Sequence, residues 1–133
     1  MIELTLLWNT PSKKNWKQWT GKYLISSKWY TKRHKEISKQ LQLVPKYNIN
    51  SCEIEITIYP DSMRKWDLTN KAESVMDVLV DLGILADDNW YVCWKVVLFF
   101  GGKDKENPRA LVKIKDEKTN YRTSVYPSND LRD

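Results

Sequence analysis

The fold is decided by residues 51–100, which read SCEIEITIYPDSMRKWDLTNKAESVMDVLVDLGILADDNWYVCWKVVLFF. From Cys52 to Tyr59 apolar and polar residues alternate, which is the pattern of a strand with one buried and one exposed face. From Leu68 to Leu82 apolar residues recur every three or four positions, as in a helix with one buried stripe. Gly83 suits the left-handed position beyond the end of this helix. Trp90 to Phe100 predicts another strand.

The flanking segments add two strands and one helix. Glu3 to Trp8 and Ala110 to Lys115 predict strands, and a basic helix is expected from Ser26 or Ser27 to about Gln42, ended by Pro45. The segment from Pro11 to Gly21 predicts a loop, because Pro, Ser, Asn and Gly interrupt it. The order is β-α-β-α-β-β, so we predict an α+β fold with a mixed four-stranded sheet and two helices packed on one face.

The chain length and composition fit one soluble globular domain spanning residues 1–133. The chain is 41% hydrophobic and 29% charged, and its longest apolar run, residues 96–100, is far shorter than a membrane span of roughly 20 residues. The N-terminus shows no basic segment followed by an apolar core, so we expect a cytoplasmic protein with no membrane partner. Residues 117–133 are polar and weakly patterned, and we expect a tail that frays or docks on a partner, including a second copy of the chain.

The two cysteines limit the metal chemistry that this chain can support. Cys52 and Cys93 lie among alternating apolar residues, which favours buried free thiols over a disulfide or a metal site. Neither belongs to a CxxC pair, and the only histidine, His34, is expected at the surface. A structural zinc site needs about four such ligands. Any catalytic metal must therefore be held by carboxylates.

The positive charge is concentrated in residues 11–40, which we call the basic arm. This segment holds nine lysine and arginine residues against one acid, Glu36, while the net charge of the whole chain is only +5. The rest of the chain is therefore slightly acidic. Such a division predicts an arm that binds a polyanion, joined to an acidic body.

Acidic residues recur in and around the second predicted helix. Glu73, Asp77 and Asp81 are four apart and share one helical face, Asp67 precedes the helix, and Asp87-Asp88 open the next strand. Mg²⁺ takes oxygen ligands, and a metal held by converging carboxylates can polarise a phosphodiester and activate water. Each acid also has a structural alternative: Asp67 as a helix N-cap, and the others as a solvated helix face and an acidic turn.

The spacing of this region resembles the RusA family of Holliday junction resolvases. The matching features are Asp67-Leu68-x-Asn70, Asp77 ten residues after Asp67, Gly83 six later, and Asp87-Asp88 next. The resemblance covers roughly residues 1–115. It implies a homodimer that depends on Mg²⁺, with Mn²⁺ as the alternative ion, uses no small-molecule cofactor and nicks two opposing strands of a four-way DNA junction. It also implies a bacterial cell or a phage-infected host as the setting.

The same resemblance implies which residues are catalytic. Asp67 matches the first aspartate of the family motif and Asp88 the late one, and both would be metal ligands, with Asp87 as a further candidate. The second motif aspartate is Thr69 here, and the motif lysine is Glu73. Glu73 lies about one helical turn beyond Thr69, so we hypothesise that its carboxylate replaces the missing ligand.

The basic arm would bind the DNA backbone, because each lysine near a phosphate releases condensed counterions. Its interleaved aromatic residues would stack on unpaired bases at the branch point; packing against the sheet is the alternative, and it is favoured for Trp29 and Tyr30. The expected DNA contacts are Lys13, Lys14, Asn15, Trp16, Lys17, Trp19, Lys22, Lys28, Lys32, Arg33, Arg64, Lys65 and Lys71. The last three are also candidates to replace the motif lysine.

The leading interpretation is a metal-dependent endodeoxyribonuclease that resolves Holliday junctions by paired, symmetric nicks in DNA recombination and repair. Thr69 and Glu73 keep a second interpretation open, a non-catalytic module that binds branched or single-stranded nucleic acid through a degenerate site. A third is a nuclease for other branched DNA. Residues 90–100 and 121–126 are the two candidate dimer surfaces.

Overall fold

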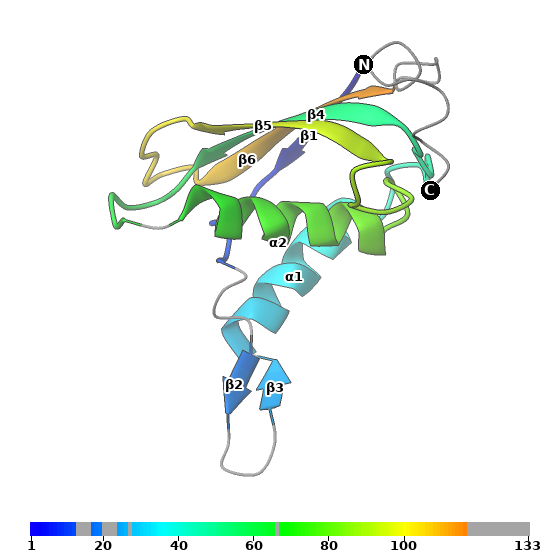
Figure 1. Cartoon of the computed structure of the whole chain (residues 1–133). Coiled ribbons are helices and arrows are strands. Elements are labelled where there is room, and N and C mark those ends of the chain that lie inside the picture. Colours follow the sequence, from blue (N-terminus) through cyan, green and yellow to red (C-terminus); the bar gives the residue numbers. More distant parts are fainter. Residues whose placement is uncertain (13–16, 20–23, 27, 66, 117–133) are drawn as a thin grey trace.

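The computed structural model describes residues 1–12, 17–19, 24–26, 28–65 and 67–116, with the backbone alone for 17–19, 24–26 and 28–30. The elements in chain order are β1 (Ile2–Leu6), β2 (Lys17–Trp19), β3 (Leu24–Ser26), α1 (Lys28–Gln40), β4 (Cys52–Tyr59), α2 (Leu68–Asp81), β5 (Cys93–Phe100) and β6 (Arg109–Asp116). Both helices lie on the same face of the main sheet (Figure 1). The predicted α+β fold is confirmed.

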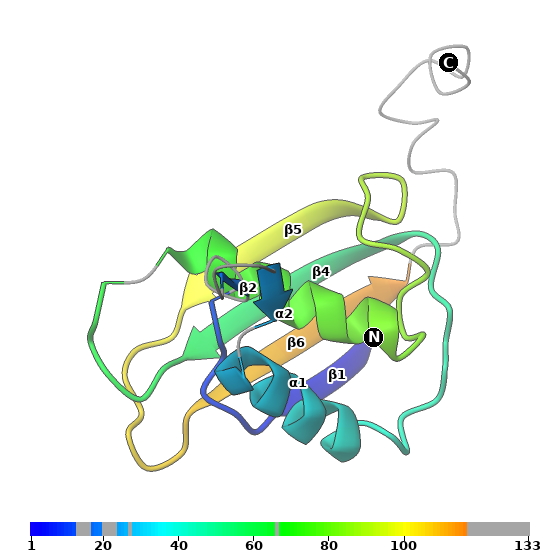
Figure 2. The same cartoon turned by 90° about the horizontal axis from the view of Figure 1, so that it is seen from below.

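The main sheet has four strands in the order β1-β6-β4-β5. Strands β4 and β5 are parallel, whereas β6 is antiparallel to both β4 and β1. A parallel pair needs a crossover connection, and α2 provides it. The view from below shows α1 and α2 lying across this sheet (Figure 2). Helix α2 therefore connects the segment that follows β4 to the turn that precedes β5.

The core fills the space between the sheet and the helices. Alternate residues of β4 point toward the helices and are at most 1% exposed, namely Ile54, Ile56 and Ile58. They meet Val75, Val78 and Leu79 of α2 in one continuous buried cluster. Burying one such aliphatic side chain contributes roughly 1.5–3 kcal/mol, so this layer fixes α2 firmly on the sheet.

Several boundaries differ from the prediction by one or two residues, and two differences are larger. The expected loop from Pro11 to Gly21 contains β2, which pairs with β3 in a two-stranded hairpin at the end of α1 far from the sheet (Figure 1). The third main strand begins at Cys93 rather than Trp90, because the Asn89 side-chain oxygen accepts hydrogen bonds from the amides of Tyr91 and Val92 and holds a turn there.

Other details agree with the sequence. Helix α2 ends at Asp81, and Gly83 has the expected left-handed conformation with φ of 74°. Cys52 and Cys93 are buried free thiols on neighbouring strands, with their sulfurs 3.8 Å apart. Within the described residues, no helix is long and apolar enough to cross a membrane.

Candidate active site

Asp67 stands at the start of α2 with its carboxylate exposed. It occupies the N-cap position, with φ of −72° and ψ of 121°, yet its side chain makes no capping hydrogen bond. One carboxylate oxygen instead accepts a hydrogen bond of 3.1 Å from the Asn70 side-chain amide. Asp67 therefore occupies the N-cap position, but its carboxylate does not cap the helix. The Asn70 side chain orients this carboxylate at the surface instead.

The acidic face of α2 continues from Asn70 through Glu73 and Asp77 to Asp81. Glu73 is exposed and Asp77 is half-buried. These two are one turn apart, which places their β-carbons about 5–6 Å from each other. Asp81 differs, because one of its carboxylate oxygens lies 3.0 Å from Nε2 of His34 of α1. His34 is accordingly half-buried between the helices, whereas the sequence suggested a surface position.

The turn after α2 holds Asp88 beside two other carboxylates. Asp87 accepts hydrogen bonds from the Asp88 amide at 2.7 Å and from the Asn89 side chain at 3.2 Å. The pKa of Asp88 is raised above its usual value, first by desolvation, then by a hydrogen bond to Asp87 and its negative charge, and also by the charge of Asp77. Asp77 and Asp88, eleven positions apart in the sequence, are therefore electrostatic neighbours.

The structure gathers the predicted acids only in part. Asp87 and Asp88 come together with Asp77, a residue that the sequence analysis placed on the acidic helical face but did not select as a metal ligand. Asp67 lies ten residues before Asp77, a rise of about 15 Å along the helix axis, and Glu73 lies between them in the sequence, one turn before Asp77. Among the described residues, no three His, Cys, Asp or Glu side chains form a group that could hold a metal ion.

Lys71 corrects one expected DNA contact. Its side chain is only 7% exposed, and its ammonium donates a hydrogen bond of 2.6 Å to the backbone carbonyl of Thr10. Burial lowers the pKa of Lys71, while the negative charge of Asp61 opposes that shift. Ser74 donates a similar bond of 2.6 Å to the Pro11 carbonyl. Lys71 therefore anchors the segment after β1 from inside, and its ammonium is not at the surface.

The remaining expected DNA contacts fall into three groups. Lys32, Arg64 and Lys65 are exposed, and Arg33 is half-buried beside Glu36 at 3.1 Å. Side chains of Lys17, Trp19 and Lys28 lie outside what the structure describes, as do residues 13–16 and Lys22 altogether.

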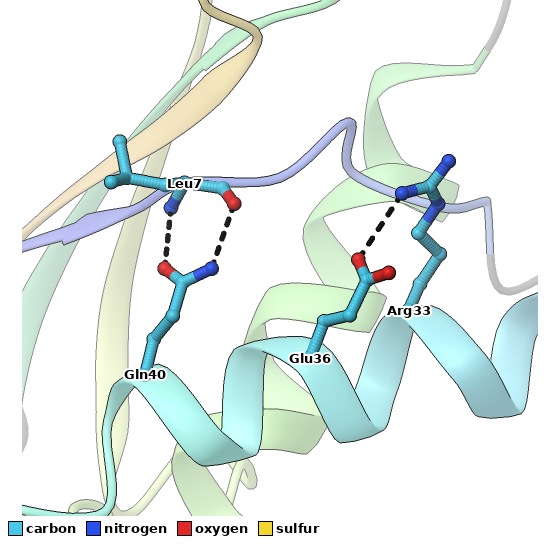
Figure 3. A network of polar contacts seen from close by, with 4 residues as sticks. All are labelled: Leu7, Arg33, Glu36 and Gln40. Atoms are coloured by element: carbon cyan, nitrogen blue, oxygen red, sulfur yellow. Dashed lines mark hydrogen bonds and ion pairs between the residues drawn. The ribbon is translucent and has the colours of Figure 1, made fainter.

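Helix α1 is fastened to the segment after β1. The Gln40 side chain accepts a bond from the Leu7 amide at 3.0 Å and donates one to the Leu7 carbonyl at 2.8 Å, beside the Arg33–Glu36 pair (Figure 3). Helix α1 thus holds the C-terminal end of the basic arm against the body. The segment that α2 anchors through Thr10 and Pro11 leads into the other end of the arm.

Exposed carboxylates along one helix, with a basic arm fastened at both ends to the same body, define a protein that acts on a polyanion. Residues 4–115 match the family model described as Endodeoxyribonuclease RusA, and no curated protein matches the chain. The match spans most of the 133 residues, and the chain therefore belongs to the RusA endodeoxyribonuclease family.

Family membership sets the general activity. The protein is an endodeoxyribonuclease, a hydrolase that acts on DNA phosphodiester bonds. The family implies an endonuclease of Holliday junctions that binds branched DNA, and its members are metal-dependent nucleases in general.

Proposed function

We propose that this protein resolves four-way DNA junctions by paired, symmetric nicks and that it uses Mg²⁺ held by carboxylates of α2 and of the turn before β5. The observation that carries this proposal is the group of acids around Asp88, whose pKa is raised first by desolvation, then by a hydrogen bond to Asp87 and the charge of Asp87, and also by the charge of Asp77. A divalent cation would neutralise such a group.

The chemistry of the donor set fits a hard cation, although among the described residues no three of these side chains are gathered into one metal-holding group. Every candidate ligand is a carboxylate, and Mg²⁺ commonly takes one or two of these, with water and substrate phosphates completing its shell. Asp88 and Asp67 are the ligands implied by the family motif, and Glu73 replaces the motif aspartate that is Thr69 here. Asp77 supplements Glu73 one turn further along α2. When bound, the ion supplies charge neutralisation and water activation at the phosphodiester.

The chain's own residues position these carboxylates. Asn70 orients Asp67 through the bond of 3.1 Å. Asn89 holds the turn that carries Asp88 by accepting two backbone hydrogen bonds, and both oxygens of Asp87 accept bonds within that turn. Asp87 thus supports the turn and contributes negative charge more than it offers an open ligand position. The basic arm would bind the phosphates that flank the scissile bond.

A homodimer follows from the symmetry of the substrate. A four-way junction has approximate two-fold symmetry, and a two-fold dimer presents two identical sites to it. Strand β5, one of the two candidate surfaces, lies at an edge of the main sheet, and no described strand pairs with its outer side. The other candidate, residues 121–126, lies outside the described residues.

The test compares a synthetic four-way junction with a linear duplex of the same sequence, each in Mg²⁺ and in chelator. We expect paired nicks in the junction alone and only with Mg²⁺. Asp88→Asn should abolish these nicks but leave junction binding intact. Glu106→Gln is the matched control, since Glu106 is an exposed carboxylate in the loop between β5 and β6. Tight binding without any cut by the unaltered protein would contradict the proposal.

A further inference from the structure

A pocket of about 270 Å³ lies beside the start of α2. It is formed where the end of β4, the segment after it, the first turn of α2 and the end of β5 meet. Its apolar lining consists of Ile58, Pro60, Met63, Leu68 and Phe100. Leu68 is the neighbour of Asp67 in the sequence, so the pocket adjoins one end of the candidate active site.

Two of these apolar side chains are exposed. Phe100 is 55% exposed and Met63 is 65% exposed, whereas Ile58 is fully buried at 1%. Ile58 therefore forms the floor, and Met63 and Phe100 reach the mouth. An aromatic ring and a thioether together at the surface offer apolar area that a flat ligand would cover.

The charged residues that line the pocket are all basic, although the carboxylate of Asp61 acts on Lys71 from close by. Arg64 and Lys65 line it and are exposed, and the buried Lys71 lies deeper. Among the described residues that line the pocket, none is acidic. The complementary ligand has a flat apolar body joined to an anionic group, and a nucleotide has both.

We propose that this pocket receives one unstacked nucleobase of the DNA substrate, with Phe100 against the base and with Arg64 and Lys65 on its phosphates. The volume suits a single base, because sites for larger small molecules begin at roughly 300 Å³. Lys65 precedes Asp67 by two residues, so a base held here keeps its backbone near the candidate catalytic carboxylates.

The pocket would also select branched DNA. A base must leave the stack before it can enter, and unstacking costs least where pairing is already interrupted, as at a branch point. In a linear duplex every base is paired and stacked, so unstacking one costs more free energy. This inference rests on the proposed action on branched DNA, and it identifies the group by which the branch is recognised.

The test is a thermodynamic cycle between the pocket and the base. Junction affinity is measured in chelator, with the intact junction and with versions in which each branch-point base in turn is replaced by an abasic site. The protein should lose roughly tenfold in affinity at one of these positions, within the range of aromatic–base stacking energies. The Phe100→Ala variant should bind the intact junction with an affinity lower by the same factor. Its affinity should not fall further when the abasic site is introduced.

The matched control is Phe99→Ala. Phe99 precedes Phe100 on β5, is 47% exposed and lies on the opposite face of the sheet. It should behave like the unaltered protein. Met63→Ala, in the segment after β4, should reproduce the effect of Phe100→Ala without altering a strand. Thermal unfolding and oligomeric state are measured for every variant.

Three results would overturn the proposal: full sensitivity of both Phe100→Ala and Met63→Ala to the abasic site, an equal loss in Phe99→Ala, or a change of oligomeric state that accounts for the loss. The last would mean that a second copy covers the pocket. Failure of the proposed function is separate, because it would appear as no junction cleavage by the unaltered protein in Mg²⁺.

Discussion

The two faces of α2 both carry polar side chains and use them differently. On the buried face, Lys71 and Ser74 donate hydrogen bonds to the carbonyls of Thr10 and Pro11 and are enclosed by the fold. On the exposed face, Glu73 reaches solvent and Asp77 faces the turn that carries Asp88. Burial, and not residue type or proximity in sequence, therefore separates the polar groups that hold this helix from those that are open to a ligand.

The largest expected effect is on the exposed face. Glu73→Gln should lower Mg²⁺-dependent junction cleavage by at least about 100-fold, since even residues behind the ligands cost 10- to 100-fold in many metal sites. Its free energy of unfolding should change by less than about 0.5 kcal/mol, as is usual for surface positions. Cleavage assays and urea unfolding measure the two quantities. Activity near that of the unaltered protein would remove Glu73 from the ligand set.

Substitutions on the buried face should have the opposite effect, lowering stability while leaving cleavage nearly unchanged. Lys71→Met leaves the buried Thr10 carbonyl without its donor, and we expect a loss of about 1–3 kcal/mol in the free energy of unfolding. Cleavage measured well below the melting temperature should stay within a few-fold. Lys103→Met, at an exposed lysine in the loop between β5 and β6, is the control and should leave stability unchanged. A Lys71→Met variant that is stable but inactive would contradict this division between the two faces, because Lys71 would then act on the substrate.

Asn70 tests whether the orientation of Asp67 matters. Asn70→Ala removes the hydrogen bond of 3.1 Å to Asp67 and should reduce cleavage by about tenfold, less than loss of a ligand, as expected of a residue that positions one. Apparent Mg²⁺ affinity, read from the metal dependence of cleavage, should weaken in parallel. The control is Asn50→Ala, at an exposed amide outside the site. No change in either quantity would mean that Asp67 needs no positioning.

The smallest expected effect concerns Ser74. Ser74→Ala should lower the free energy of unfolding by about 1 kcal/mol, the usual net contribution of one internal hydrogen bond. Because Ser74 and Lys71 bond to adjacent carbonyls, their losses should not add in the double variant. Unfolding free energies of the two single variants and the double variant measure this coupling. Strict additivity would show that Thr10 and Pro11 are held independently.

Much of the fold follows from periodicity. Strand β4 spans the predicted residues, and α2 begins at the predicted Leu68, because alternation and the three-to-four spacing directly reflect which side faces the core. Strands β2 and β3 were missed, since three residues each are too few to show a period. The late start of β5 depends on hydrogen bonds that the Asn89 side-chain oxygen accepts from the amides of Tyr91 and Val92, which no pattern of apolar residues reveals.

The candidate site was harder to predict, because it also depends on contacts that a pattern of apolar residues does not reveal. Lys71 lies four residues before Val75 and thus on the buried stripe, a signal present in the sequence but outweighed by its charge. The neighbourhood of Asp77 and Asp88 arises only when α2 crosses from β4 to β5, and the sequence showed Asp77 on an acidic helical face without showing that Asp88 lies beside it. The Thr10 carbonyl that accepts from Lys71 lies 61 positions away.

The most direct measurement is residue-specific NMR line broadening by Mn²⁺, a paramagnetic substitute for Mg²⁺. We expect substoichiometric Mn²⁺ to broaden the amides around Glu73, Asp77 and Asp88 first. Asp81, which is paired with His34, and Glu53 and Glu55 on the opposite face of the sheet should be affected later. Broadening centred on those other acids, or none at millimolar Mn²⁺, would contradict the claim that the exposed face of α2 and the turn before β5 hold the metal.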